Sequence, residues 1–206
     1  MFRRLRKNRL RKKLGPPVVV VSGLPRSGTS MMMKMLDAAG LELFIDNIRS
    51  ADEDNPKGYF EYEPVKELAD TEDRSWLRDC KGKVIKIISF LLAHLSDDFY
   101  YRVIFMERDL NEVMASQNKM LVRRGEQVDK DGGEKMIGIW QFHLRKTAVT
   151  LREKENVEML YVAYRDALES PREQAARVSR FLGGGLDVDR MTGVVDPQLY
   201  RNRSGA

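Results

Sequence analysis

The stretch Val18-Val-Val-Val-Ser-Gly23-Leu-Pro-Arg-Ser-Gly28-Thr-Ser30 decides the fold. A run of β-branched residues stops at Gly23, four residues separate Gly23 from Gly28, and an apolar stretch that favours a helix follows. A valine run of this kind is typical of a strand covered on both faces of a parallel sheet. The stretch therefore predicts a strand, a glycine-rich turn and a helix, in that order.

The glycine-rich turn predicts a cradle for a phosphate-like anion. Backbone N–H groups of such a turn wrap the anion, and the N-terminus of the next helix favours negative charge. The spacing follows the phosphate-binding pattern G-x-x-x-x-G-K-[ST], except that Thr29 stands at the lysine position and Arg26 brings the cation into the turn. Because that lysine usually holds the terminal phosphates, we expect a phosphate-like donor rather than ATP hydrolysis.

Strand and helix patterns alternate along the rest of the chain. The periodicity predicts strands at 17–22, 83–89, 102–106 and 157–163, helices at 29–39, 65–80, 110–124, 135–154 and from Pro171 to about 182, a short helical segment at 90–95, loops at 46–58 and 129–133, and an irregular end. Alternation of this kind predicts an α/β fold with three layers, α/β/α, around a central parallel sheet of about four to five strands, of the P-loop type.

Charge divides the chain into an arm and a body. The chain has 206 residues and a net charge of +5, and eight basic side chains lie between residues 3 and 13 (Arg3, Arg4, Arg6, Lys7, Arg9, Arg11, Lys12 and Lys13). The remainder therefore carries a net charge of −3, which argues against a specific nucleic-acid partner. We expect a basic arm at 1–15 and a single domain at 16–206, a length that suits one domain.

The arm has two interpretations, and the cysteine content suggests a compartment. The arm is expected to be flexible and solvated, with contact to an anionic membrane surface as the alternative. No stretch approaches the roughly 18 apolar residues of a membrane span. Cys80 is the single cysteine, so no intrachain disulfide forms and a cytoplasmic location is expected.

The parallel sheet predicts where a ligand binds. Ligands of such sheets bind outside the carboxyl ends of the strands, so the residues that follow each strand should converge. Arg108 ends the third expected strand, and Ser116 lies two turns into the next helix. An arginine and a hydroxyl can grip a second phosphate together. The alternative is a surface arginine paired with Glu107 or Asp109.

Three segments in the right order resemble the sulfotransferases that use 3′-phosphoadenosine 5′-phosphosulfate (PAPS). Pro25–Ser30 resembles the family's 5′-phosphosulfate loop, and Arg108–Ser116 resembles its 3′-phosphate motif. Tyr164-Arg-Asp-Ala-Leu168, followed by Pro171 and Phe181-Leu-Gly183, is similar to a third family segment. The resemblance covers residues 17 to 183 and is nearest to the small bacterial members.

The resemblance implies an enzyme and a donor site. A sulfuryl group would move in line from PAPS to a hydroxyl or amine of a small-molecule, glycan or protein acceptor, without a metal ion. The donor-binding residues that it implies are Arg26, Ser27, Gly28, Thr29, Ser30, Arg108, Ser116 and Tyr164. Arg26 would stabilise the leaving phosphate, and Tyr164 would lie near the adenine.

The general base does not carry over from the family. Its cytosolic members use a histidine just after the second strand, where this chain has Ile88 or Ser89. His94, a few residues later, is one candidate. Glu61 is another, with Glu63 beside it, because relatives that act on polysaccharides or proteins use a glutamate in this segment. We expect Glu61 to be the base, and the alternative is that its carboxylate only stabilises a helix start.

Two further residues have open roles. Lys86 lies within the second expected strand, where it either contacts the transferring sulfuryl group or simply faces solvent or the cleft. His143 lies in the middle of the long helix at 135–154, and we expect an ordinary surface or packing residue there.

Two other functions remain open at this point. A small-molecule kinase of the P-loop type should have a lysine at position 29 and an acidic magnesium ligand after a strand, for which Asp109 is the candidate. A non-catalytic nucleotide-binding module, tethered to a membrane by the arm, would have a donor site but no base.

Overall fold

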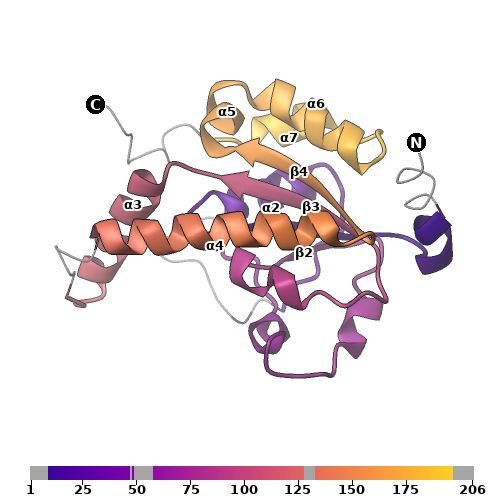
Figure 1. Ribbon diagram of the computed structural model, residues 1–206. Helices are drawn as coiled ribbons and strands as arrows, with labels where there is room; N and C mark the ends of the chain where they lie inside the picture. Colours follow the sequence, from indigo (N-terminus) through magenta and orange to yellow (C-terminus); the bar gives the residue numbers. More distant parts are fainter. Residues whose placement is uncertain (1–8, 47, 49–57, 128–132, 197–206) are drawn as a thin grey trace.

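Four parallel strands form the centre of the protein in a computed structural model that describes residues 9–46, 48, 58–127 and 133–196 (Figure 1). The strands are β1 (Val18–Gly23), β2 (Val84–Lys86), β3 (Tyr101–Glu107) and β4 (Val157–Ala163), in the order β2-β1-β3-β4. All three pairings are parallel. Every residue of β1 is buried, as its unbroken apolar run predicts for a central strand.

Helices cover both faces of the sheet, which confirms the three-layer α/β/α arrangement. One face packs against α2 (Thr29–Ala38), α5 (Tyr164–Glu169), α6 (Pro171–Leu182) and α7 (Val188–Gly193). The other face packs against α4 (Gly133–Glu153) and the short 3-10 segments η1 (Glu63–Glu67), η2 (Ser75–Arg78) and η3 (Ser89–His94). Figure 1 shows α5, α6 and α7 together on one side of the strands and the long α4 on the other.

The remaining long helix, α3 (Leu110–Arg123), marks the edge at which a ligand is expected. It follows directly from β3, and in Figure 1 the arrows of β3 and β4 point toward its side of the molecule. A small apolar cluster of Leu24, Val113 and Trp140 joins the glycine-rich turn to α3 and α4. The carboxyl edge of the sheet is thus enclosed by the turn and these two helices.

One expected helix is absent and two short helices were not expected. The prediction of a helix at 65–80 is wrong, because η1 and η2 are separate single turns. Polar side chains break the segment between them: the Thr71 hydroxyl accepts a hydrogen bond from the N–H of Asp73, and the Asp73 carboxylate accepts one from Ser75. The short helices α5 and α7 were missed because six residues are too few to show a helical period.

Other boundaries differ in smaller ways. Strand β2 stops at Lys86 rather than at residue 89, although the N–H of Ile87 still donates to the Val21 carbonyl at 3.0 Å. Residues 9–14 of the expected arm form a helical turn, and residues 1–8 lie outside the described residues. Most of the expected loops at 46–58 and 129–133 also lies outside them.

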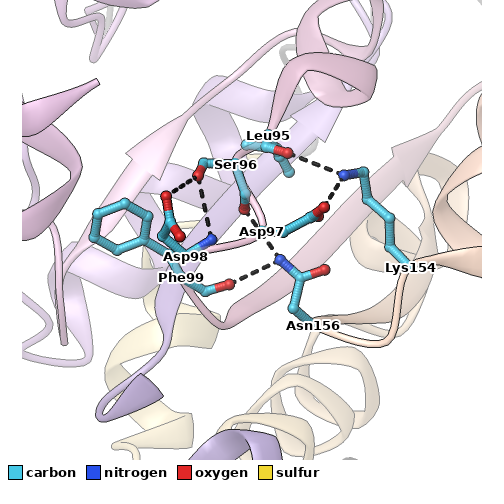
Figure 2. A network of polar contacts seen from close by, with 7 residues as sticks. All are labelled: Leu95, Ser96, Asp97, Asp98, Phe99, Lys154 and Asn156. Atoms are coloured by element: carbon cyan, nitrogen blue, oxygen red, sulfur yellow. Dashed lines mark hydrogen bonds and ion pairs between the residues drawn. The ribbon is translucent and has the colours of Figure 1, made fainter. Parts of the chain in front are cut away.

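A hydrogen-bonded network closes the amino end of the sheet (Figure 2). The side-chain amide of Asn156 donates to the carbonyls of Ser96 and Phe99, at 3.1 and 2.8 Å. The ammonium group of Lys154 donates to the Leu95 carbonyl at 3.1 Å. These contacts tie the loop before β3 to the connection between α4 and β4.

Among the described helices, none is long and apolar enough to cross a membrane.

Candidate functional site

The glycine-rich turn adopts a backbone that only glycine fits at two positions. Gly23 has φ 149° and Gly28 has φ 96°. A Cβ atom on Gly23 would lie 2.4 Å from Ser27 Oγ, and one on Gly28 would lie 2.3 Å from Cδ2 of Tyr164. Both distances are far below van der Waals contact, so the two glycines allow the turn to close against its neighbours.

Arg26 lies in this turn and reaches the next helix. Its φ of 71° is in the left-handed region, which costs a side-chain-bearing residue about 1 kcal/mol. Its Nε donates to Ser116 Oγ at 3.1 Å, and its carbonyl accepts from Nη1 of Arg108 at 3.0 Å. The turn therefore touches both Arg108 and Ser116, as the expected convergence at the carboxyl edge requires.

Arg108 is held in a buried position by two further contacts. Its Nε lies 3.0 Å from Oε2 of Glu112, and the two side chains are only 8% and 5% exposed. Its guanidinium carbon lies 4.5 Å from the centroid of the Tyr164 ring. Neither Glu107 nor Asp109 is the partner in this ion pair; the i,i+4 spacing to Glu112 was a readable signal that sequence reasoning did not use.

The cation–aromatic contact links all three sequence segments. Tyr164 follows β4, packs against Gly28 of the turn and lies under the Arg108 guanidinium.

Asp109 caps a helix. Its carboxylate accepts hydrogen bonds from the N–H groups of Asn111 and Glu112 at the start of α3. The candidate magnesium ligand of a kinase is therefore engaged as a helix cap.

A second polar cluster surrounds Lys86 at the start of α2. The Lys86 ammonium group donates to Ser30 Oγ at 3.2 Å and to the Tyr59 carbonyl. Oε1 of Glu61 lies 3.8 Å from the same nitrogen. Because the Lys86 side chain is 8% exposed, the structure brings a buried cation and a carboxylate to the N-terminal turn of α2.

The other two candidate bases lie elsewhere. His94 is the last residue of η3 and is exposed. Glu63 is exposed in an ion pair with Lys66 at 2.8 Å. Of these three candidates, Glu61 is the one that has a contact with Lys86 in the part of the chain that the structure describes.

His143 has contacts that its sequence position did not suggest. Its Nε2 lies 3.0 Å from Ser89 Oγ and 3.4 Å from Thr147 Oγ1. Its ring stacks on Phe90 with centroids 3.9 Å apart. Burial, and then the positive charge of Lys146, lower the pKa of His143, so the imidazole is neutral near pH 7. Periodicity cannot find such a pair, because 54 residues separate Ser89 from His143.

The N-terminus of α2 has features that favour binding of an anion. Its N-cap residue, Gly28, offers no side-chain cap, and no acidic residue lies in the first turn. The first N–H groups of a helix have no partner within the helix and carry the positive end of its dipole. Ser27 Oγ is also buried, with no hydrogen-bond partner among the described residues. These features fit a bound phosphosulfate group, which would supply the missing acceptors.

A cavity of about 610 Å³ begins beside this cradle. It runs from Ser27 and Arg108 into the space between α4 and the ends of β3 and β4. Its walls are largely apolar and include Phe105, Leu144 and Met159. Such a volume is typical of small-molecule sites, so an apolar group has room next to Ser27 and Arg108.

Comparison with solved structures identifies the architecture. Sulfotransferase STF1 from Mycobacterium tuberculosis matches with a TM-score of 0.56 and 17% identity, over 93% of this chain and 76% of that chain. The sulfotransferase domain from the curacin biosynthetic pathway matches with a TM-score of 0.52 and 13% identity, over 88% and 78%. The chain has the sulfotransferase fold.

A longer protein gives a weaker structural match. A retinol dehydratase in complex with androsterone and the inactive cofactor PAP has a TM-score of 0.45 and 16% identity, over 92% of this chain and 66% of that chain. No protein-family model matches this chain, and neither does any curated protein sequence. At these identities the likeness establishes the fold, so activity has to be argued from the side chains.

Proposed function

We propose that this protein is a PAPS-dependent sulfotransferase. It would move the sulfuryl group of PAPS to a hydroxyl or amine of an acceptor. The observation that carries the proposal is the convergence of two anion-binding groups: Arg26 of the glycine-rich turn contacts Ser116, and Arg108 contacts the Arg26 carbonyl. A donor with phosphate on both sides of its ribose needs two such groups within one nucleotide length.

The 5′-phosphosulfate would occupy the cradle at the N-terminus of α2. The N–H groups of the turn and the hydroxyls of Ser27, Thr29 and Ser30 would hydrogen-bond its oxygens. Burial of Ser27 Oγ without a partner among the described residues supports this assignment. The 3′-phosphate would lie against Arg108 and Ser116, with the adenine toward Tyr164.

Transfer would depend on positive charge held near the sulfuryl group. In a loose in-line reaction the protein mainly positions the reactants and stabilises the charge that grows on the leaving phosphate. Arg26 would do this from the turn, and Lys86 from β2, since its ammonium group already contacts Ser30 of the cradle. The acceptor is proposed only by its reactive group, in a small molecule, a glycan or a protein, and the reaction is proposed to occur in the cytoplasm.

Thermal unfolding with different nucleotides tests the proposal. 3′-Phosphoadenosine 5′-phosphate (PAP) without magnesium should stabilise the protein by about 2.7 kcal/mol at 100 times its dissociation constant. Adenosine 5′-phosphate, which lacks the 3′-phosphate, is the matched control and should stabilise it much less at the same concentration. Stabilisation by Mg-ATP but not by PAP would reject this function and favour the kinase.

Transfer itself is measured with radiolabelled PAPS and a cell extract. We expect label to appear in an acceptor, which mass spectrometry then identifies. Binding of PAP without any labelled product would instead favour a non-catalytic nucleotide-binding module.

A further inference from the structure

The proposed reaction needs a base, and His143 on α4 lies at the edge where the reaction would occur. Val21 of β1 is in register with Lys86 of β2, and the Ile87 N–H still bonds to the Val21 carbonyl. The end of β2 therefore lies beside the last residues of β1, which lead into the glycine-rich turn. Ser89, whose hydroxyl contacts His143, is the first residue of η3 and follows Ile87 by two positions.

A second contact places the same face of α4 at the turn. Trp140 lies one helical turn before His143, and it packs with Leu24 of the glycine-rich turn. Residues three apart lie on the same face of a helix. The position of His143 at the carboxyl edge therefore rests on two separate contacts, one through Ser89 and one through Trp140.

The imidazole is oriented in the way a base requires. Nε2 is held by the hydroxyls of Ser89 and Thr147, and the ring face is held by Phe90. Nδ1 has no hydrogen-bond partner among the described residues, and the side chain is partly exposed. When the two hydroxyls accept from the Nε2–H group, Nδ1 carries the lone pair that accepts a proton.

Burial, and then a nearby positive charge, lower the pKa of the imidazole and leave the ring neutral before reaction. Lys146 on α4 is the charged group that acts on it, while η3 presents a hydroxyl and an aromatic ring at this point. Glu61 is differently placed, because its carboxylate lies 3.8 Å from the Lys86 ammonium group, with which it forms an ion pair.

We propose that His143 is the general base of the sulfuryl transfer, with Ser89 and Thr147 as positioning residues; this rests on the proposed function. Nδ1 takes the proton of the acceptor hydroxyl or amine as the acceptor atom forms its bond to sulfur. The bond between sulfur and the bridging oxygen breaks, and its electron pair leaves with the 5′-phosphate as PAP. The imidazolium then returns its proton to water.

Nuclear magnetic resonance of the imidazoles tests the location without an acceptor. The chain has two histidines, so ¹³C-histidine labelling gives two imidazole signals, and His143→Gln assigns them. Saturation with PAP should shift the His143 signal and raise the pKa of His143, because a phosphate would lie nearby. The His94 signal should not move. An unchanged His143 signal in a chain that PAP stabilises would overturn the proposal.

Kinetics then test the role, with 2-naphthol as the acceptor probe. His143→Ala should lower kcat by roughly 10²- to 10⁴-fold while the dissociation constant of PAP stays the same. Gln141→Ala, an exposed position on the same helix, is the control and should keep the wild-type rate. Ser89→Ala should shift the acidic limb of the pH profile of kcat. A residue that only supports the structure would not change this limb.

The outcomes separate this proposal from the function on which it rests. Full activity in His143→Ala, or loss of kcat in Glu61→Gln or His94→Ala instead, would reject His143 as the base and leave the sulfotransferase proposal standing. Failure of PAP to stabilise the wild-type chain would reject the proposed function, and the role of His143 with it.

Discussion

The two ends of the sheet are built in opposite ways. At the amino end, Asn156 and Lys154 satisfy carbonyl groups of the loop before β3 with neutral and charge-assisted hydrogen bonds (Figure 2). At the carboxyl end, Arg26 has a left-handed φ and Ser27 Oγ is buried without a partner in the described part of the chain. The carbonyl groups of the loop before β3 therefore have side-chain donors, whereas the glycine-rich turn has a strained residue and a buried hydroxyl without a donor or acceptor among the described residues.

This difference predicts which substitutions change the stability of the fold and which change nucleotide binding. Matched buried polar groups stabilise a fold, whereas strained backbones and unmatched donors are typical of sites that a ligand completes. Substitutions at the amino end should therefore lower the free energy of unfolding and leave nucleotide binding intact. Substitutions at the carboxyl end should do the reverse.

After the loss expected at His143, the largest effect on the rate of transfer is expected at Arg26. Arg26→Ala should lower this rate by roughly 10²- to 10³-fold, because it removes the cation that would stabilise the leaving phosphate. Arg26→Gly should be as inactive but about 1 kcal/mol more stable than Arg26→Ala, because glycine adopts a positive φ without strain. Denaturant unfolding and single-turnover assays measure the two effects, and equal stability of the variants would argue against strain at this residue.

Asn156 is the corresponding test at the amino end. Asn156→Ala should lower the free energy of unfolding by about 2 kcal/mol, since it leaves the Ser96 and Phe99 carbonyls without their donor. The dissociation constant of PAP, measured by calorimetry below the unfolding transition, should match that of the wild type. A weakened affinity for PAP would show that the two ends are coupled.

Arg108→Lys should weaken the binding of nucleotides that carry a 3′-phosphate and spare those that lack it. Lysine keeps the charge but loses the planar fork and its contact with Tyr164, so the dissociation constant of PAP should rise by roughly 10-fold. Adenosine 5′-phosphate lacks the group that Arg108 would hold, and its affinity should stay nearly constant. An equal loss for both nucleotides would assign Arg108 to the structure of the turn rather than to the 3′-phosphate.

The smallest expected effect is at Lys154. Its ion pair with Asp97 is 2.7 Å long, but the Asp97 side chain is 80% exposed. Lys154→Ala should therefore lower the free energy of unfolding by about 0.5 to 1 kcal/mol, mainly through the lost bond to the Leu95 carbonyl. High salt should have little effect on the free energy of unfolding of this variant. A loss of stability as large as that of Asn156→Ala would contradict the prediction.

Much of the fold could be predicted from sequence because its signals are local. The valine run, the two glycines and the Asp109 cap each fix a boundary through the conformation of a few neighbouring residues. The segment at 65–80 failed because its apolar residues keep a helical period while polar side chains at 71–75 bind the backbone in turns. Propensity alone does not decide between these outcomes.

The site was harder to predict because its contacts join distant residues. The glycine-rich turn was visible as a continuous motif. The bond from Arg26 to Ser116 spans 90 positions, and the pair of Ser89 and His143 spans 54. The pairing of β1 with β3 brings the turn to α3, and the packing of α4 against η3 brings His143 to Ser89. Neither arrangement can be read from local periodicity.

The ring of Tyr164 has a consequence for selectivity. It fills the space beside Gly28, and its centroid lies 4.5 Å from the guanidinium carbon of Arg108, so this rigid ring would help to fix Arg108 relative to the proposed phosphosulfate cradle. A ring of fixed size would then limit which nucleotides fit. Nucleotides whose two charged ends are too near or too far apart, such as those phosphorylated at a different ribose hydroxyl, would engage one group and miss the other.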